Sequence, residues 1–232
     1  MKLRFSRIRA IAVLVVALPP MFVSAQTYME VHSSKPEEIE WTWEVRPAHI
    51  DVKLPNVLLV GDSITRNYYP ETQRQLSGVA NVYLMATSAS VGDPRLPRQL
   101  KDFSVMEGVP FKVVHFNNGM HGWTYSEVEY RKAFESFLAA LHSIAPGASF
   151  IWATTTPIKV DAVPGPTNAR INARNGIAQT FVKDDAFPID DQHELMTHHA
   201  DQYEDTVHFN TVGAAIQAQQ VAQYIRLALT KP

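Results

Sequence analysis

The sequence has no cysteine among its 232 residues. This absence excludes a disulfide scaffold, a thiol nucleophile and any zinc or iron–sulfur site that needs cysteine ligands. A large excess of charge is also lacking, because 21 Lys and Arg residues against 23 Asp and Glu residues give a formal net charge of −2. We therefore expect no nucleic-acid partner. Hydrophobic residues at 46% and charged residues at 19% are typical of a globular protein.

Long apolar runs are missing too. The most apolar run, Ala10–Leu18, is well short of the roughly 20 residues that a membrane-spanning helix needs. Four basic residues and no acidic ones precede it, and small residues ending at Ala25 follow it. This order is typical of a secretory signal peptide over residues 1–25, with cleavage near Ala25. We expect an exported protein, periplasmic or extracellular, with no stable membrane anchor after cleavage.

The predicted leader changes the charge balance of the rest of the chain. Four of the 21 basic residues lie in residues 1–25, so the remaining 207 residues carry 17 basic and 23 acidic side chains, a net charge of −6. An acidic protein is not drawn to anionic membrane surfaces. Residues 26–54, with Trp41 and Trp43, are predicted to be an irregular lead-in, and residues 55–232 a single domain.

Apolar runs alternate with amphipathic ones from about residue 55 onward. Short β-branched or aromatic runs predict strands that are covered on both faces. Helical spacing of apolar residues, a capping box at Ser126 and Glu129, and Pro146-Gly147 as a stop predict the helices. The predicted strands are Asn56–Val60, Asn81–Met85, Phe111–Phe116 and Ser149–Ala153, and the predicted helices are Ser126–Ile144, Ala169–Val182 and one from about Asn210.

This alternation predicts an α/β fold: a three-layer, doubly wound parallel sheet of the flavodoxin-like kind in a single domain. Ligands of such sheets bind outside the carboxyl ends of the strands. Four unusual segments each follow a predicted strand directly, and a fifth precedes the last helix. They are residues 61–65 (GDSIT), 87–94 (TSASVGDP), 117–122 (NNGMHG), 154–157 (TTTP) and 205–208 (DTVH).

Ser63 lies at a predicted strand-to-helix turn, where its hydroxyl would be exposed. A serine hydroxyl becomes a useful nucleophile only when a base takes its proton and a third group orients that base. His208 is a candidate base, and Asp205 can reach its imidazole from the same loop. Two simpler interpretations stay open: Ser63 could be a helix cap and nothing more, and His208 could be a surface histidine.

The blocks Gly61-Asp62-Ser63-Ile64 and Asp205-Thr206-Val207-His208 together resemble the SGNH/GDSL hydrolase family, over roughly residues 55–229. The α/β-hydrolase family fits less well, because its Gly-x-Ser-x-Gly motif would need glycine where Thr65 stands. The resemblance implies Ser63 as nucleophile, His208 as general base and Asp205 as the residue that orients it. It also implies an oxyanion hole made by the backbone N–H groups of Ser63 and Gly92 and by an asparagine side chain after the third strand.

The third block departs from the family's usual Gly-x-Asn-Asp. If Gly119 is its glycine, His121 takes the asparagine position, as in a subgroup that the sequence Asn-Asn-Gly-Met-His resembles. If the loop is shifted, Asn118 or Asn117 supplies the amide. A neutral imidazole N–H can donate to an oxyanion much as an amide does. We expect Asn118 and His121 both to line the site.

Other polar and aromatic residues near these loops are candidates for substrate contact, namely Asn117, Trp123 and Thr156. We expect no metal and no organic cofactor. His193 and His198 are five positions apart, not the four that place two zinc ligands on one helix face, and we expect a solvated loop there. The sequence also lacks the glycine-rich phosphate loops of nucleotide-binding proteins.

These features together predict an exported serine esterase that cleaves carboxylic esters, with short, acetyl-like acyl groups favoured because no long apolar lid segment is visible. The substrate would be a small-molecule or glycan ester. The alternatives are an acyltransferase with the same triad, a lysophospholipase or thioesterase, and a non-catalytic glycan-binding relative. The sequence does not indicate an oligomeric state.

Overall fold

The structure is a computed structural model that describes residues 34–230. The predicted signal peptide and its cleavage site lie outside these residues and stay predictions. Among the helices of residues 34–230, none is both long and apolar enough to cross a membrane.

A six-stranded sheet forms the centre of the domain, in the order β1-β3-β2-β4-β5-β6. Neighbouring strands run parallel except at one edge, where β1 pairs antiparallel with β3. The strands are β1 (Thr42–Val45), β2 (Asn56–Gly61), β3 (Asn81–Thr87), β4 (Val113–Phe116), β5 (Ser149–Ala153) and β6 (Ile189–Asp190).

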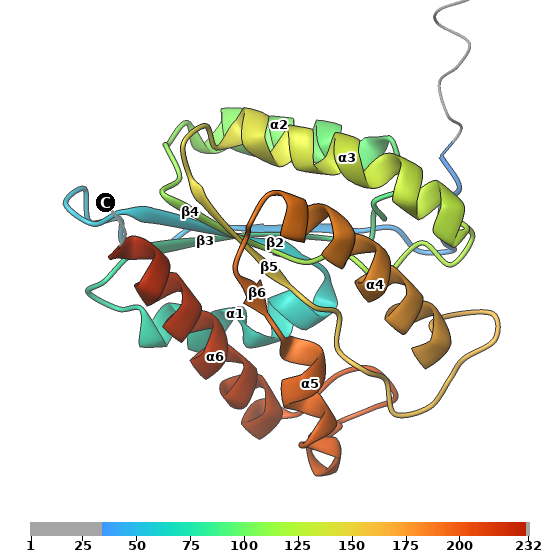
Figure 1. Ribbon diagram of the computed structural model, residues 1–232. Coiled ribbons are helices and arrows are strands. Elements are labelled where there is room, and N and C mark those ends of the chain that lie inside the picture. Colours follow the sequence, from blue (N-terminus) through green and yellow to red (C-terminus); the bar gives the residue numbers. More distant parts are fainter. Residues whose placement is uncertain (1–33, 231–232) are drawn as a thin grey trace, which may run out of the picture. The chain divides into compact units, whose positions relative to one another are not determined.

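Helices cover both faces of this sheet (Figure 1). Helices α2 and α3 lie over one face, whereas α1 and α6 pack against each other over the opposite face. This arrangement confirms the predicted three-layer α/β fold. The helices are α1 (Ser63–Gln75), α2 (Arg95–Glu107), α3 (Glu127–Ile144), α4 (Asn168–Asp184), α5 (Gln192–Thr197) and α6 (Thr211–Leu229), with a short 3₁₀ helix at Ala200–Gln202.

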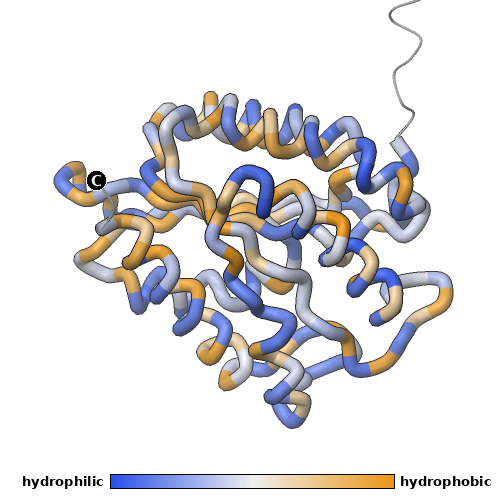
Figure 2. The backbone as a smooth tube through the Cα atoms, in the orientation of Figure 1, coloured by the Kyte–Doolittle hydropathy of each residue, from blue (hydrophilic) through white to orange (hydrophobic). Residues whose placement is uncertain are grey.

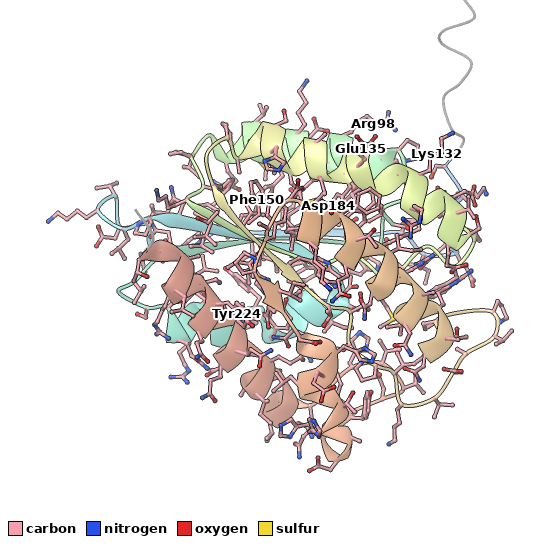
Figure 3. The ribbon with its side chains drawn as sticks, viewed as in Figure 1. Arg98, Lys132, Glu135, Phe150, Asp184 and Tyr224 are labelled. Carbon is pink, nitrogen blue, oxygen red and sulfur yellow. The ribbon has the colours of Figure 1, made fainter. Side chains whose placement is uncertain are left out.

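Each face of the sheet has its own hydrophobic core, and the apolar colouring in Figure 2 is concentrated along the central strands. Alternate residues of one strand point to the two cores: Leu58 and Val60 of β2 join one core, and Val57 and Leu59 the other. Figure 3 labels one residue from each core, Phe150 of β5 and Tyr224 of α6. Burial on both faces explains why the central strands are continuous apolar runs.

The predicted capping box of α3 is present. The Ser126 hydroxyl accepts a hydrogen bond from the Glu129 N–H, and the Glu129 carboxylate accepts one from the Ser126 N–H. Strand β5 has the predicted bounds, and α6 begins after an Asn210 cap as expected. These local signals determine where α3, β5 and α6 begin.

The predicted irregular lead-in differs from the structure at one place, because β1 is a strand. Its residues Thr42–Val45 pair with Leu84–Thr87 of β3 in antiparallel register. The strand is short and mostly exposed, since it lies at the sheet edge. It therefore lacks the apolar run by which the buried strands are recognised in the sequence, and the sheet is mixed at this edge.

Candidate active site

Ser63 is the first residue of α1, and only Asp62 separates it from the end of β2. The side chain of Asp62, not of Ser63, caps the helix, because Asp62 Oδ1 accepts a hydrogen bond of 2.9 Å from the Ile64 N–H. The interpretation of Ser63 as only a helix cap therefore fails. The close turn needs glycine at position 61, where a Cβ would lie 2.0 Å from the Thr65 hydroxyl oxygen.

The structure brings Ser63, His208 and Asp205 together. The Ser63 hydroxyl lies 2.8 Å from His208 Nε2, and His208 Nδ1 lies 2.8 Å from Asp205 Oδ2. A carboxylate only accepts hydrogen bonds, so Nδ1 carries the proton and Nε2 is free to accept one from Ser63. The arrangement has the contacts that an activated serine nucleophile requires.

The electrostatics of Asp205 keep it ionised. Burial by itself raises the pKa of Asp205, but hydrogen bonds from the backbone N–H groups of His208 and Val207 and from the His208 imidazole lower it to about 2. The two backbone bonds, both to Asp205 Oδ1, are 2.7 Å long. The carboxylate is thus held by the same turn that carries the histidine.

The loop that carries His208 is tied to its surroundings on both sides. The side-chain amide of Asn67, one turn into α1, donates a 2.6 Å hydrogen bond to the Phe209 carbonyl. The Tyr203 hydroxyl donates to the Pro157 carbonyl at 2.8 Å, and the Lys159 N–H donates to the Thr206 carbonyl at 2.9 Å. These bonds hold the imidazole beside Ser63.

Asn117 and Asn118 are buried at the end of β4 and brace the neighbouring loops. The Asn118 amide donates to the Ala89 carbonyl at 2.9 Å, and its oxygen accepts from the Val91 N–H at 3.0 Å. The Asn117 amide donates to the Ala153 carbonyl at 2.7 Å. The Asn118 side chain is engaged at both ends, but its amide nitrogen has a second hydrogen, so Asn118 and His121 both stay candidates for the third oxyanion donor. The predicted roles of both asparagines with substrate stay predictions.

Gly92 lies in the tight turn that follows β3. A side chain does not fit there, because a Cβ would lie 2.7 Å from the ring of Tyr125. The Gly92 N–H points to the Ser90 hydroxyl at 3.3 Å, which is long for a hydrogen bond. An N–H with so long a contact is available to a better acceptor. The oxyanion role of Gly92 stays a prediction.

His121 lies in the loop after β4, and its side chain is only 12% exposed. Its ring is edge-on to Trp41 at 5.7 Å and stacked on Trp123 at 6.0 Å. The other neighbour of Trp41 is Arg66 of α1, whose guanidinium lies 5.5 Å from the indole ring. Trp41 thus contacts both His121 and a residue of α1, the helix that begins at Ser63, and Trp123 contacts His121.

Arg174 of α4 is fully buried and binds the backbone of the loop that contains His121. Its guanidinium donates hydrogen bonds to the backbone carbonyls of Gly119, His121, Gly122 and Tyr125, at 2.5–3.2 Å. The cation also lies 5.1 Å from the centre of the Tyr130 ring. One buried side chain therefore fixes the backbone of most of this loop.

We expect Arg174→Met to lower the free energy of unfolding by about 3–5 kcal/mol, because it leaves buried carbonyls without their charged donor. Urea denaturation of the variant measures this loss. Lys183→Met on the same helix is the matched control, since Lys183 is exposed and should change stability by less than about 0.5 kcal/mol. Equal midpoints for both variants would contradict the bracing role of Arg174.

Two hollows adjoin the predicted site residues. One, of about 10 Å³, is lined by Ile64, Asn117 and Thr156 among others, which is room for about one water molecule. Thr156 is 2% exposed, so its predicted contact with substrate stays a prediction. The second is a groove of about 650 Å³ beside Gly92, whose further lining includes Lys132 of α3, labelled in Figure 3.

Of the histidines considered as metal ligands, His193 lies in helix α5 and not in the predicted loop, and His198 is the C-cap of this helix. The carboxylate of Asp191 caps this helix by accepting from the Glu194 N–H. His193 Nδ1 lies 2.8 Å from the Thr155 carbonyl oxygen, and His198 pairs with Glu194. Within residues 34–230 no group of three or more His, Asp or Glu side chains is arranged to hold a metal ion.

Sequence reasoning missed two residues of the site, Arg174 and Glu37. Glu37 Oε2 lies 2.9 Å from His121 Nδ1, and Glu37 Oε1 accepts from the Gly122 N–H at 2.6 Å. Glu37 belongs to a run of charged residues in the predicted lead-in, which looks like a solvated segment. Arg174 stands in helix α4 four positions after Arg170, and only its full burial distinguishes it from this half-buried neighbour.

Known structures resemble this one closely in fold. No protein-family model and no functionally curated protein matches the sequence. A GDSL-like lipase from Bacteroides thetaiotaomicron superimposes with a TM-score of 0.60 at 14% identity, over 78% of this chain and 93% of that chain. A lipase/acylhydrolase from Enterococcus faecalis gives a TM-score of 0.59 at 18% identity, over 75% and 96%. The fold is that of the SGNH/GDSL hydrolases.

A third neighbour with the SGNH/GDSL-hydrolase fold has a name that points to acyl transfer. It is the C-terminal catalytic domain of peptidoglycan O-acetyltransferase A from Streptococcus pneumoniae, with a methylsulfonyl adduct. The TM-score is 0.55 at 19% identity, over 77% of this chain and 97% of that chain. The chain described here thus spans nearly the whole of each of these domains.

Proposed function

We propose that this protein is an exported serine esterase of the SGNH type that hydrolyses carboxylic esters. The observation that carries the proposal is the pair of 2.8 Å contacts that link Ser63 to His208 and His208 to Asp205. The support from the fold is that neighbours matched over 93% and 96% of their own length are named a lipase and a lipase/acylhydrolase. Export rests on the N-terminal pattern of basic, apolar and small residues.

In the proposed reaction the Ser63 oxygen attacks the ester carbonyl carbon while His208 Nε2 takes the hydroxyl proton. The carbon–oxygen bond to the alcohol then breaks, and the imidazolium gives its proton to the leaving alcohol. A water molecule, deprotonated by His208, attacks the acyl-enzyme and releases a carboxylic acid and free Ser63. The N–H groups of Ser63 and Gly92 and the side chain of His121 would stabilise the two oxyanions.

The hollows near the site favour a short acyl group on a polar alcohol. The 10 Å³ hollow is too small for an acyl chain. The larger groove beside Gly92 is lined by several charged side chains, among them Lys35, Asp93 and Glu129. The same groove also has an apolar lining from Val91, Tyr125 and Ala133, and a mixed lining of this kind suits a sugar or another polyol, whose rings have both polar and apolar faces.

We expect kcat/KM to be no higher for the longer esters than for p-nitrophenyl acetate, since each added methylene that finds no apolar pocket gains no binding energy. The measurement is kcat/KM over the even-numbered chain lengths, with a sulfonyl fluoride as a second probe that should modify Ser63 and no other serine. Uniformly slow cleavage at every chain length and no labelled Ser63 would end the esterase proposal.

An acyltransferase is the second candidate, and the O-acetyltransferase among the fold neighbours is the observation that favours it. Both reactions share the acyl-enzyme and differ in the acceptor, which is water or an alcohol. Product analysis with and without an added oligosaccharide separates them. Acetylated sugar as the main product would favour transfer, and free acetate in both mixtures would favour hydrolysis.

A further inference from the structure

Residues 34–41, here termed the strap, cross the loops that follow β3 and β4. The Thr124 hydroxyl donates to the Lys35 carbonyl at 2.8 Å, and the Trp41 N–H donates to the Ser88 hydroxyl at 2.8 Å. Between these two attachments, Glu37 reaches the loop of His121. The strap therefore brings a carboxylate to the side of the site where the oxyanion would form.

The contact with Glu37 determines which nitrogen of His121 holds a proton. Both Glu37 oxygens accept hydrogen bonds, one from His121 Nδ1 at 2.9 Å and one from the Gly122 N–H at 2.6 Å. A neutral imidazole with its proton on Nδ1 has a bare Nε2, which accepts and cannot donate. The neutral donor expected from the sequence is thus the wrong tautomer here, and only the imidazolium has an Nε2–H.

The groups around His121 favour that charged form. Burial alone lowers the pKa of His121, but the hydrogen bond to Glu37 and the charges of Asp62, Glu37 and Glu40 raise it above its ordinary value. Asp62 is 1% exposed, and one of its carboxylate oxygens has no hydrogen-bond donor within residues 34–230. The cation that faces this loop is Arg174, which binds the His121 carbonyl.

One aromatic neighbour acts in the same direction. Trp123 is stacked on the imidazole ring, and an indole face attracts a cation, whereas the Trp41 ring is nearly perpendicular to the imidazole. Arg66 lies on Trp41 as well, 5.5 Å from its ring. Within the described residues, Nε2 of His121 has no hydrogen-bond partner, so it is the free donor of an otherwise occupied ring.

We propose that Glu37 is a positioning residue that holds His121 as an imidazolium, so that its Nε2–H donates to the oxyanion formed at Ser63. The inference rests on the proposed function, because the oxyanion arises only when Ser63 attacks an ester. A charged donor makes a stronger hydrogen bond than the neutral amide of the family's usual asparagine. It also gives the enzyme an alkaline limit, at which His121 loses the proton that it donates.

Glu37→Gln tests this role. We expect kcat for p-nitrophenyl acetate to fall by about 10- to 1,000-fold, the upper limit being the loss of one oxyanion donor, with KM little changed. The alkaline limb of the pH profile should move to lower pH, and Glu37→Asp should restore part of the activity. Glu38→Gln is the matched control, since the exposed neighbour Glu38 should leave both kcat and the profile unchanged.

His121→Asn supplies the background in which Glu37 should no longer matter. Its amide donates at every pH, so the alkaline limb assigned to His121 should disappear. Adding Glu37→Gln to this variant should then change kcat by less than about 3-fold, in contrast to its effect in the wild type. An effect of equal size in both backgrounds would mean that Glu37 acts on the fold and not through His121, which overturns the inference.

An NMR titration of the His121 ring gives a readout that does not depend on activity. In the wild type the ring should stay protonated to higher pH than in Glu37→Gln, and identical titrations would overturn the inference. If the wild type cleaves no ester, the proposed function itself fails. An active wild type whose kcat and pH profile are unchanged by Glu37→Gln overturns only the role of Glu37.

Discussion

Replacing Ser63 by alanine should lower kcat for p-nitrophenyl acetate by about 10⁵- to 10⁶-fold, because no other group can form the acyl-enzyme. Removal of a triad serine leaves only the catalysis that substrate binding and the oxyanion hole provide. The proton that His208 would accept is lost together with the nucleophile. The assay is the release of p-nitrophenol, corrected for spontaneous hydrolysis.

The same variant should fold normally, which makes its loss of activity easy to interpret. The Asp62 carboxylate caps α1, so the Ser63 hydroxyl carries no structural hydrogen bond other than the one to His208. We expect a free energy of unfolding within about 0.5 kcal/mol of the wild type. Ser77→Ala, at the exposed far end of α1, is the control that should keep full activity. More than a tenth of the wild-type rate in Ser63→Ala would exclude Ser63 as the nucleophile.

The second large effect is expected for Asp205→Asn, with a fall in kcat of about 10⁴-fold. The asparagine oxygen can still accept the two backbone N–H groups that Asp205 Oδ1 now accepts. Its amide would then face His208 Nδ1 as a donor, which moves the imidazole proton to Nε2. In that tautomer His208 cannot take the proton of Ser63, and the rate falls although the geometry is kept.

Steady-state kinetics of Asp205→Asn, with Glu204→Gln as the control on the same loop, measures this effect. Glu204 is exposed, and its side chain has no hydrogen-bond partner within residues 34–230, so the control should match the wild type. A fall of less than 10-fold in Asp205→Asn would mean that another group orients His208. KM should stay within about 3-fold in both variants, since neither side chain binds substrate in the proposed reaction.

The pH dependence follows from the ionisation of Asp205. Its pKa of about 2 is below the ordinary value near 3.9, so the folded state favours the carboxylate. The stability that this carboxylate contributes is therefore complete above about pH 4 and is lost as the pH falls through about 2. Protonation of Asp205 therefore does not account for any loss of activity at mildly acidic pH.

The elements that the sequence predicts well are those with a local physical signal. The buried run Ser149–Ala153 and the capping box at Ser126 need no knowledge of distant residues. Helix α1 lacks such a signal, because it contains Pro70 and buries polar side chains such as Thr65 and Thr72. Strand β1 likewise has no signal in its own sequence, since its pairing with β3 depends on residues some 40 positions away.

The candidate site divides in the same way. Ser63, Asp205 and His208 are predictable as a set because their chemistry is complete within two short motifs. The protonation of His121 is not, because it depends on Glu37, which lies 84 positions earlier in a run of exposed charged residues. The availability of the Asn118 amide also depends on tertiary structure, since the loop after β3 occupies it.

The separation along the chain of the groups that meet at the site has a consequence for protein synthesis. Ser63 and His208 are 145 positions apart, whereas the last strand of the sheet ends at Asp190. A nascent chain that has emerged as far as β6 therefore contains every strand of the described sheet but has no base for its serine. In the proposed reaction, ester hydrolysis therefore cannot begin before synthesis has passed His208, and shorter chains are inactive.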